Sequence, residues 1–126
     1  MAIKLGTKIV NGLKDSSIYA SIDSNIITTG SLGLSTLTPG KTYLLDSSGN
    51  SIDINCDLNS TEDIGKQWTF VLVSIGNPVD FKNSSATPYS TLPGHFPSIV
   101  TSSYATVTAT QITTSEVIVQ GSLQPI

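Results

Sequence analysis

The sequence contains no arginine, one cysteine, one histidine and few charged residues of either sign. One cysteine cannot form an internal disulfide, and one cysteine with one histidine is too few for a zinc cluster. Six lysines against nine acidic residues give a formal net charge of −3, which argues against a phosphate-binding surface. We therefore expect no cofactor, no bound metal and no nucleic-acid partner.

Long apolar runs are also missing from the chain. No stretch approaches the roughly 18 consecutive apolar residues that a membrane-spanning helix needs. Near the N-terminus, Lys4, Gly6 and Lys8 interrupt the apolar residues, so a secretory signal is not expected. We expect no membrane contact, and we expect the protein to be made and folded in a cytoplasm.

Serine and threonine are abundant instead, making up 35 of the 126 residues. Good helix formers are scarce, whereas β-branched residues are common. Short alternating apolar runs recur between turn residues at spacings of about 8–12 positions, which is typical of sandwiches and barrels. The pattern and the length predict an all-β fold: a single small antiparallel β-sandwich or barrel-like domain over residues 1–126.

Alternation also places the individual strands. The run "QWTFVLVSIG" is apolar on both faces, which predicts a central strand or one at a subunit interface. In residues 98–112, the wet face is expected to carry Tyr104, Thr106, Thr108 and Thr110, and the other face Ala105, Val107 and Ala109. The expected strands are residues 3–10, 17–22, 42–46, 51–58, 67–76, 98–112 and 116–120, with a weaker one at 26–37.

Turn residues mark the connections between these strands. Pro39-Gly40 has type II turn chemistry, because Gly40 accepts a positive φ. Residues 47–50, "SSGN", predict a tight turn that joins 42–46 and 51–58 as a β-hairpin. Ser60 is a candidate cap for a single helical turn that Gly65 would end.

Residues 82–97 form the longest irregular segment expected. Loops of this length in a small domain are usually functional or disordered. Pro88, Pro93 and Pro97 reduce the entropy of the unfolded segment, which favours an ordered loop.

Candidates for catalysis are few. Cys56 and His95 are the only possible nucleophile–base pair, but Cys56 falls on the apolar face of its strand, where it packs as a small hydrophobe. No G-x-S-x-G nucleophile elbow occurs. We therefore predict no catalytic residues and no enzymatic activity.

An acidic run resembles the start of a calcium loop. Asp53, Asn55 and Asp57 fit its first three ligand positions. Leu58 then stands where the loop needs glycine, and Ile64 stands where it needs glutamate. The plain interpretation is that the three polar residues are the solvent face of a strand whose other face carries apolar residues.

The run "TYLLDSSGNSIDINCDLNSTEDIGKQWTFVLVSIGNPVDFKNSS", residues 42–85, resembles a β-hairpin module of bacteriophage virion proteins. The matching features are a strand ending in Asp46, a Ser/Gly turn, an alternating strand, Gly65-Lys66, and an aromatic strand followed by a valine-rich one. The closing "ATVTATQITTSEVIVQGSL" looks like the last strands of that module. Such modules occur in fibres, head fibres and capsid decorations, as trimers.

The resemblance implies a non-enzymatic structural protein of the virion. It points to a capsid decoration or cement protein, made in the host cytoplasm, that forms a homotrimer on the outer capsid surface. Its partner would be the major capsid protein, and it would stabilise contacts between capsomers. The alternative is a receptor- or carbohydrate-binding module of a fibre, with exposed aromatics near Tyr89 and His95.

Two segments are the expected partner contacts. Residues 1–14 can act as an extended N-terminal arm, and residues 82–97 form a long, proline-stiffened loop. The candidate contact residues are Ile3, Leu5, Ile9, Tyr89, Leu92, His95 and Phe96.

Overall fold

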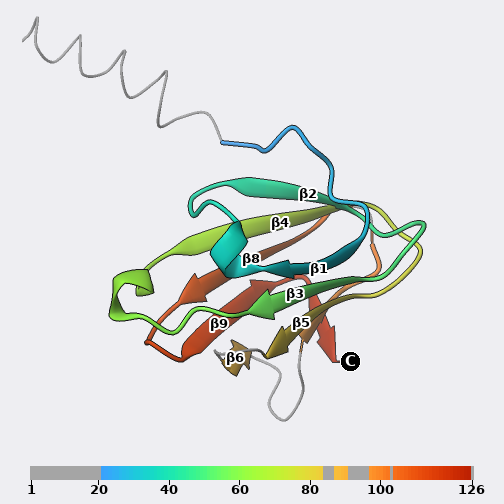
Figure 1. Ribbon diagram of the computed structural model, residues 1–126. Helices are drawn as coiled ribbons and strands as arrows, with labels where there is room; N and C mark the ends of the chain where they lie inside the picture. The colour runs from blue at the N-terminus through green and yellow to red at the C-terminus, as the bar shows by residue number, and fades with distance from the viewer. Residues whose placement is uncertain (1–20, 84–86, 91–96, 103, 126) are drawn as a thin grey trace, which may run out of the picture.

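The computed structural model describes residues 21–83, 87–90, 97–102 and 104–125, which form two five-stranded β-sheets packed face to face (Figure 1). The predicted all-β fold is confirmed, in the form of a sandwich. In chain order the elements are β1 (Gly30–Gly33), the 3-10 helix η2 (Leu34–Thr36), β2 (Thr42–Asp46), β3 (Ile52–Cys56), the 3-10 helix η3 (Thr61–Asp63), β4 (Gln67–Ser74), β5 (Val79–Asn83), β6 (Thr87–Ser90), β7 (Pro97–Ile99), β8 (Ala105–Gln111), β9 (Glu116–Gly121) and β10 (Leu123–Pro125).

The chain changes sheet at nearly every strand. Sheet A has the order β2-β4-β8-β9-β6, and sheet B has the order β1-β3-β5-β7-β10. Because β1 to β5 alternate between the sheets, β1, β2 and β3 each pair in parallel with the strand two places further on. The C-terminal strands pair mainly antiparallel, as β4 with β8 and β8 with β9. The expectation of antiparallel pairing throughout is therefore corrected to a mixed sandwich.

The predicted hairpin around residues 47–50 is wrong, because β2 lies in sheet A and β3 in sheet B. The Ser47 N–H donates to the Ser74 carbonyl (3.0 Å), and the Asn77 N–H donates to the Ser47 carbonyl (2.8 Å). These bonds tie the start of the turn to the end of β4. After this exposed turn the chain continues in sheet B, so the inner faces of β2 and β3 both point into the shared core.

Three other expectations are corrected. Residues 98–112 form two strands in different sheets, β7 and β8, separated by a turn that ends at Tyr104. Residues 82–97 are not irregular throughout, since β6 lies within them, at the edge of sheet A and parallel to β9. Proline is tolerated in an edge strand, because one side of that strand donates to no neighbour. The expected strand at 26–37 shrinks to β1 followed by η2.

The cap and turn predictions at Ser60, Gly65 and Gly40 hold. Ser60 accepts a hydrogen bond from the Glu62 N–H (3.3 Å) at the start of η3, and Gly65 follows with a φ of +91°. Gly40 has a φ of +83°, as its turn requires. The expected strand 3–10 and the arm 1–14 lie outside the described residues, as does almost all of the strand 17–22.

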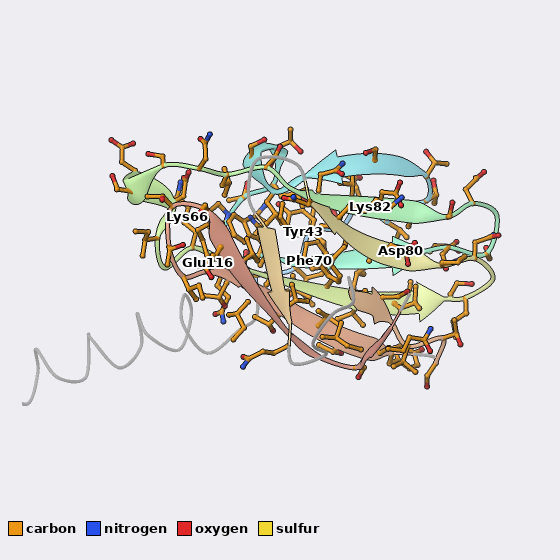
Figure 2. All side chains as sticks on the ribbon, turned by 90° about the horizontal axis from the view of Figure 1, so that it is seen from below. Tyr43, Lys66, Phe70, Asp80, Lys82 and Glu116 are labelled. Carbon is orange, nitrogen blue, oxygen red and sulfur yellow. The ribbon has the colours of Figure 1, made fainter. Side chains whose placement is uncertain are left out.

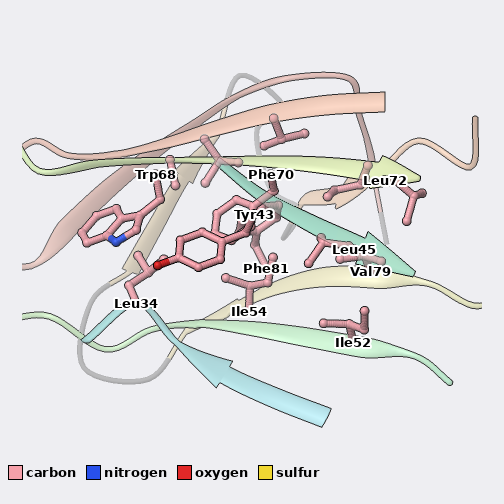
Figure 3. Packing of buried hydrophobic residues seen from close by; sticks show 14 of the residues in the cluster. Leu34, Tyr43, Leu45, Ile52, Ile54, Trp68, Phe70, Leu72, Val79 and Phe81 are labelled. Atoms are coloured by element: carbon pink, nitrogen blue, oxygen red, sulfur yellow. The ribbon is translucent and has the colours of Figure 1, made fainter. Parts of the chain in front are cut away.

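The core lies between the sheets and is centred on three aromatic rings (Figure 3). Phe70 stacks with Tyr43 at 6.1 Å between centroids and meets Phe81 edge-on at 5.8 Å, so it contacts a ring from each sheet. Aromatic pairs of this kind add about 0.5–1.5 kcal/mol beyond their buried area. The buried members of the core are Leu34, Tyr43, Leu45, Ile52, Ile54, Cys56, Trp68, Phe70, Leu72, Val79, Phe81, Ile99, Ala105, Val107, Ala109, Val117 and Val119.

Polar groups on the large rings are bonded at the rim of the core. The Trp68 indole N–H donates to the Leu37 carbonyl (3.2 Å), and the Tyr43 hydroxyl accepts from the Thr38 N–H (2.6 Å). Both bonds reach the segment after η2. The two bonds therefore hold that segment over one end of the sandwich. The broad surfaces of the sandwich are the outer faces of its two sheets.

Candidate interaction surfaces

One outer face of the sandwich consists of threonine, aliphatic and amide side chains. It belongs to sheet A, in which residues that point outward alternate with residues of the core. Strand pairing aligns Thr42 of β2 with Thr69 of β4 and Thr108 of β8 in one row. We call this surface the threonine face; its members are Thr42, Leu44, Gln67, Thr69, Val71, Val73, Thr106, Thr108, Thr110, Ile118 and Gln120.

The threonine face carries no charge in its interior. Its members are half-buried or exposed. Charged residues stand at its margins, with Asp46 ending β2 and Glu116 beginning β9. The Glu116 carboxylate accepts from the Thr113 hydroxyl (3.2 Å). A partner that approaches the middle of this face meets hydroxyl, amide and methyl groups only.

Tyr104 lies at the end of the threonine face, directly before β8. Its side chain is 72% exposed, and its φ of +62° lies in a region that residues other than glycine rarely adopt. The Tyr104 N–H donates to the Leu72 carbonyl (2.7 Å), and its carbonyl accepts from the Thr106 hydroxyl (3.0 Å). These bonds hold the turn before β8 while most of the aromatic side chain stays in solvent.

The outer face of sheet B has the opposite character. We call it the aspartate face; its members are Ser31, Asp53, Asn55, Asp57, Asp80 and Lys82. The parallel register sets Asp53 of β3 beside Asp80 of β5, and Asn55 beside Lys82. Figure 2 shows Asp80 and Lys82 along the same strand. The face therefore carries three carboxylates and one ammonium group.

The aspartate face is held together by specific side-chain bonds. Asp57 accepts from both the N–H (2.9 Å) and the hydroxyl (2.6 Å) of Ser35, which fixes η2 against the end of β3. The Lys82 ammonium lies 3.4 Å from an Asp53 carboxylate oxygen. The Asn55 amide donates to the Ser31 hydroxyl. Asp53 and Asn55 thus lie on the outer face of β3, as their alternation predicted, and Asp57 directly follows that strand.

A carboxylate also shapes the turn after β2. Asp46 accepts from the Ser48 N–H (2.9 Å) and from the Ser48 hydroxyl (2.6 Å). Because the Ser48 hydroxyl and N–H favour the charged form, the pKa of Asp46 lies below its usual value. The group thus serves the fold of the turn.

The opposite end of the sandwich has its own polar cluster. Asp63 is nearly buried and pairs with the Lys66 ammonium at 2.7 Å. The buried Gln111 amide donates to the carbonyls of Thr113 (2.8 Å) and Leu58 (3.4 Å). Lys66 and Glu116 lie at this same end in Figure 2. The cluster joins the η3 loop to the β8–β9 turn.

Cys56 is fully buried on the inner face of β3, as predicted. Burial, with a smaller contribution from Asp57, raises the pKa of its thiol to about 12. At neutral pH the thiolate, which is the reactive form, is therefore almost absent. Cys56 has the properties of a packing residue.

Most of the predicted contact residues lie outside the described part of the chain: Ile3, Leu5, Ile9, Leu92, His95 and Phe96. The backbone of Tyr89 is placed in β6, opposite Ile118 of β9. The partner contacts assigned to these residues thus stay predictions.

Sequence reasoning missed two features of the surface. The sequence analysis placed Tyr104 within a continuous strand, because no neighbouring residue indicates a positive φ at this position. It recognised the threonines of residues 98–112 as a wet face, but not their continuation onto Thr42 and Thr69. That continuation depends on strand register, which the alternation of a single strand does not contain.

In the described ranges, no three or more His, Cys, Asp or Glu side chains come together as a metal site. No helix in that part of the chain has the length and apolar character to cross a bilayer. The chain matches no protein-family model, and neither curated proteins nor solved structures gave a match.

Proposed function

We propose that this chain is a non-enzymatic structural protein of a bacteriophage particle, a capsid decoration or cement protein. It binds the outer surface of the shell, contacts the major capsid protein as a homotrimer and stabilises the contacts between capsomers. The proposal rests on the resemblance of residues 42–85 to virion modules and on the surfaces of the sandwich. The protein is made in the host cytoplasm and is then located on the outer capsid surface.

The observation that carries the proposal is the threonine face. A broad sheet surface of hydroxyl and aliphatic groups is suited to contact with another protein, because burying it removes apolar area from water without isolating a charge. Each Å² of apolar area buried contributes about 25 cal/mol. The acidic side chains, in contrast, bond within the fold, as Asp57 does with Ser35 and Asp63 with Lys66.

A cement protein can stabilise a shell through many contacts that are each of modest affinity. A copy that is bound to one capsomer meets the second at a high effective concentration. Its overall affinity for the pair therefore exceeds the affinity of either contact alone. In the homotrimer, the threonine face can lie against a neighbouring copy, and the contacts with the shell remain those predicted for residues 1–14 and 82–97. The charged aspartate face is suited to solvent.

Shells assembled without this protein test the proposal. Purified protein is mixed with such shells, bound protein is measured by co-sedimentation, and the shells are then heated. We expect saturable binding and a higher temperature of shell disruption, whereas shells that already carry the protein should bind none. Protein that leaves naked shells untouched but binds a glycan array would replace this function with that of a receptor- or carbohydrate-binding module.

A further inference from the structure

We propose that the threonine face, with Tyr104 at its end, is the surface through which copies of this chain contact one another. The inference deepens the proposed function and rests on it only for the setting in which the contact is used. It commits to a second copy of the chain as the occupant. Three observations lead to it: the register of the threonine face, the distribution of charge, and the conformation of Tyr104.

The register makes the surface continuous. Thr42, Thr69 and Thr108 form one row across three strands, and Gln120 of β9 continues it. In the next row, Val71 lies between Leu44 and Thr106. Side chains directly opposite on one face of a sheet are in contact range, so the rows form one layer.

The distribution of charge selects the occupant. The chain has a net charge of −3, so contact between two copies meets the least repulsion where charge is absent. Contact through the aspartate faces would place Asp53 and Asp80 of one copy against the same groups of the other. The threonine face has no like charges to oppose, and it offers nothing for a strongly charged partner to complement. In the homotrimer, the surface that matches its chemistry is the threonine face of each neighbouring copy, with the three faces turned toward the common axis.

Tyr104 provides the independent observation. A tyrosine at φ +62° is disfavoured relative to glycine, so the fold alone does not account for the residue. The residue is 72% exposed, so its side chain gains little from the core of its own chain. Tyrosine is enriched at protein interfaces because its ring is apolar and its hydroxyl is polar. In a contact between copies, the Tyr104 side chain would pack against the neighbouring copy at the edge of the interface.

The test compares two variants that add the same charge to opposite faces. Thr108→Glu adds a carboxylate to the centre of the threonine face, and Asn55→Glu adds one to the centre of the aspartate face. Both positions are half-buried on inner strands of their sheets. Sedimentation velocity over a concentration series measures self-association, and thermal unfolding confirms that each variant is folded.

We expect the wild-type protein to associate and Thr108→Glu to weaken that association by about tenfold or more. Asn55→Glu should associate like the wild type. Tyr104→Gly relieves the backbone and removes the ring, so its thermal stability should be unchanged or higher while its association weakens. If Thr108→Glu does not fold, Tyr104→Gly decides the question.

The inference is overturned if the wild type stays monomeric at about 0.1 mM, where an interface of standard size would be populated. It is also overturned if association is lost in Asn55→Glu and kept in Thr108→Glu. Binding to naked shells separates this result from the proposed function. An associating wild type that ignores shells contradicts the capsid role alone, and a monomer that binds shells contradicts the self-contact alone.

Discussion

The two outer faces of the sandwich cover the same core, yet they are built from different chemistry. Sheet A presents threonine and valine, which favour strands on their own account. Sheet B presents Asp53, Asn55 and Asp57, which are poor strand formers, and it compensates with bonds to particular partners such as Ser35. The stability of sheet A is therefore spread over many cross-strand pairs, while that of sheet B is concentrated in a few contacts.

This difference separates what the fold demands from what it leaves free. The inner faces of both sheets must fill one shared core, so their composition is fixed by packing. The outer faces have no such demand, and their chemistry is free to differ. Perturbations that strike the shared core should affect both sheets, and those on the outside should affect one.

The largest effect is expected where the sheets meet. Phe70→Ala removes the ring that contacts Tyr43 and Phe81, and it should lower the free energy of unfolding by about 3–5 kcal/mol. Urea denaturation followed by Trp68 fluorescence measures the loss. A loss under about 1 kcal/mol would show that the rings do not join the sheets and that each sheet is stable largely on its own.

The second effect is confined to sheet B. Gly33→Ala would drive its new methyl group into the Asp57 carboxylate, which should lower the free energy of unfolding by about 1–3 kcal/mol. Gly49→Ala is the matched control, because its methyl group meets open space. In an Asp57→Ala background the cost of Gly33→Ala should shrink; an unchanged cost would place its origin in the backbone instead.

The inner faces could be predicted from the sequence, and the arrangement of the strands could not. Alternation correctly assigned Ile52, Ile54 and Cys56 to the inside, because the period of a strand is a local property. The same alternation is satisfied whether the next strand folds back within its sheet or crosses the core. The predicted hairpin at residues 47–50 failed for this reason, and the parallel pairing of β2 with β4 was missed with it.

The candidate surface was predictable only in part. Threonines at 106, 108 and 110 were assigned to a wet face from the sequence, and the structure places them there. Their alignment with Thr42 and Thr69 depends on contacts far apart in the chain. The turn at Tyr104 divides a run that reads as one strand, because serine, threonine and tyrosine are all compatible with a strand.

A smaller effect should appear at acidic pH, in the turn that links the two sheets. The pKa of Asp46 is lower in the folded state than its usual value, owing to the bonds from Ser48. The stability it contributes is present above about pH 4 and is lost as the pH falls through the folded pKa. Between about pH 5 and pH 3, the melting temperature of Asp46→Asn should fall less steeply than that of the wild type. Ser48→Ala removes the hydroxyl but keeps the N–H, so its slope should lie between those of the wild type and Asp46→Asn. A slope equal to the wild type in both variants would show that this turn does not contribute to the acid response.

The smallest effect is expected on the open surface of sheet B. The Lys82–Asp53 pair has a separation of 3.4 Å and both side chains are more than a third exposed, so water and salt screen it. Lys82→Met should cost about 0.5 kcal/mol or less at low salt, and the difference should vanish at about 1 M sodium chloride. Thr110→Val on the threonine face is the matched comparison, because a change between uncharged residues should show no such salt dependence. If Lys82→Met instead costs well over 1 kcal/mol at every salt concentration, the aliphatic part of the Lys82 side chain and not its charge stabilises β5. The aspartate face would then be stabilised by packing spread over many residues, as the threonine face is.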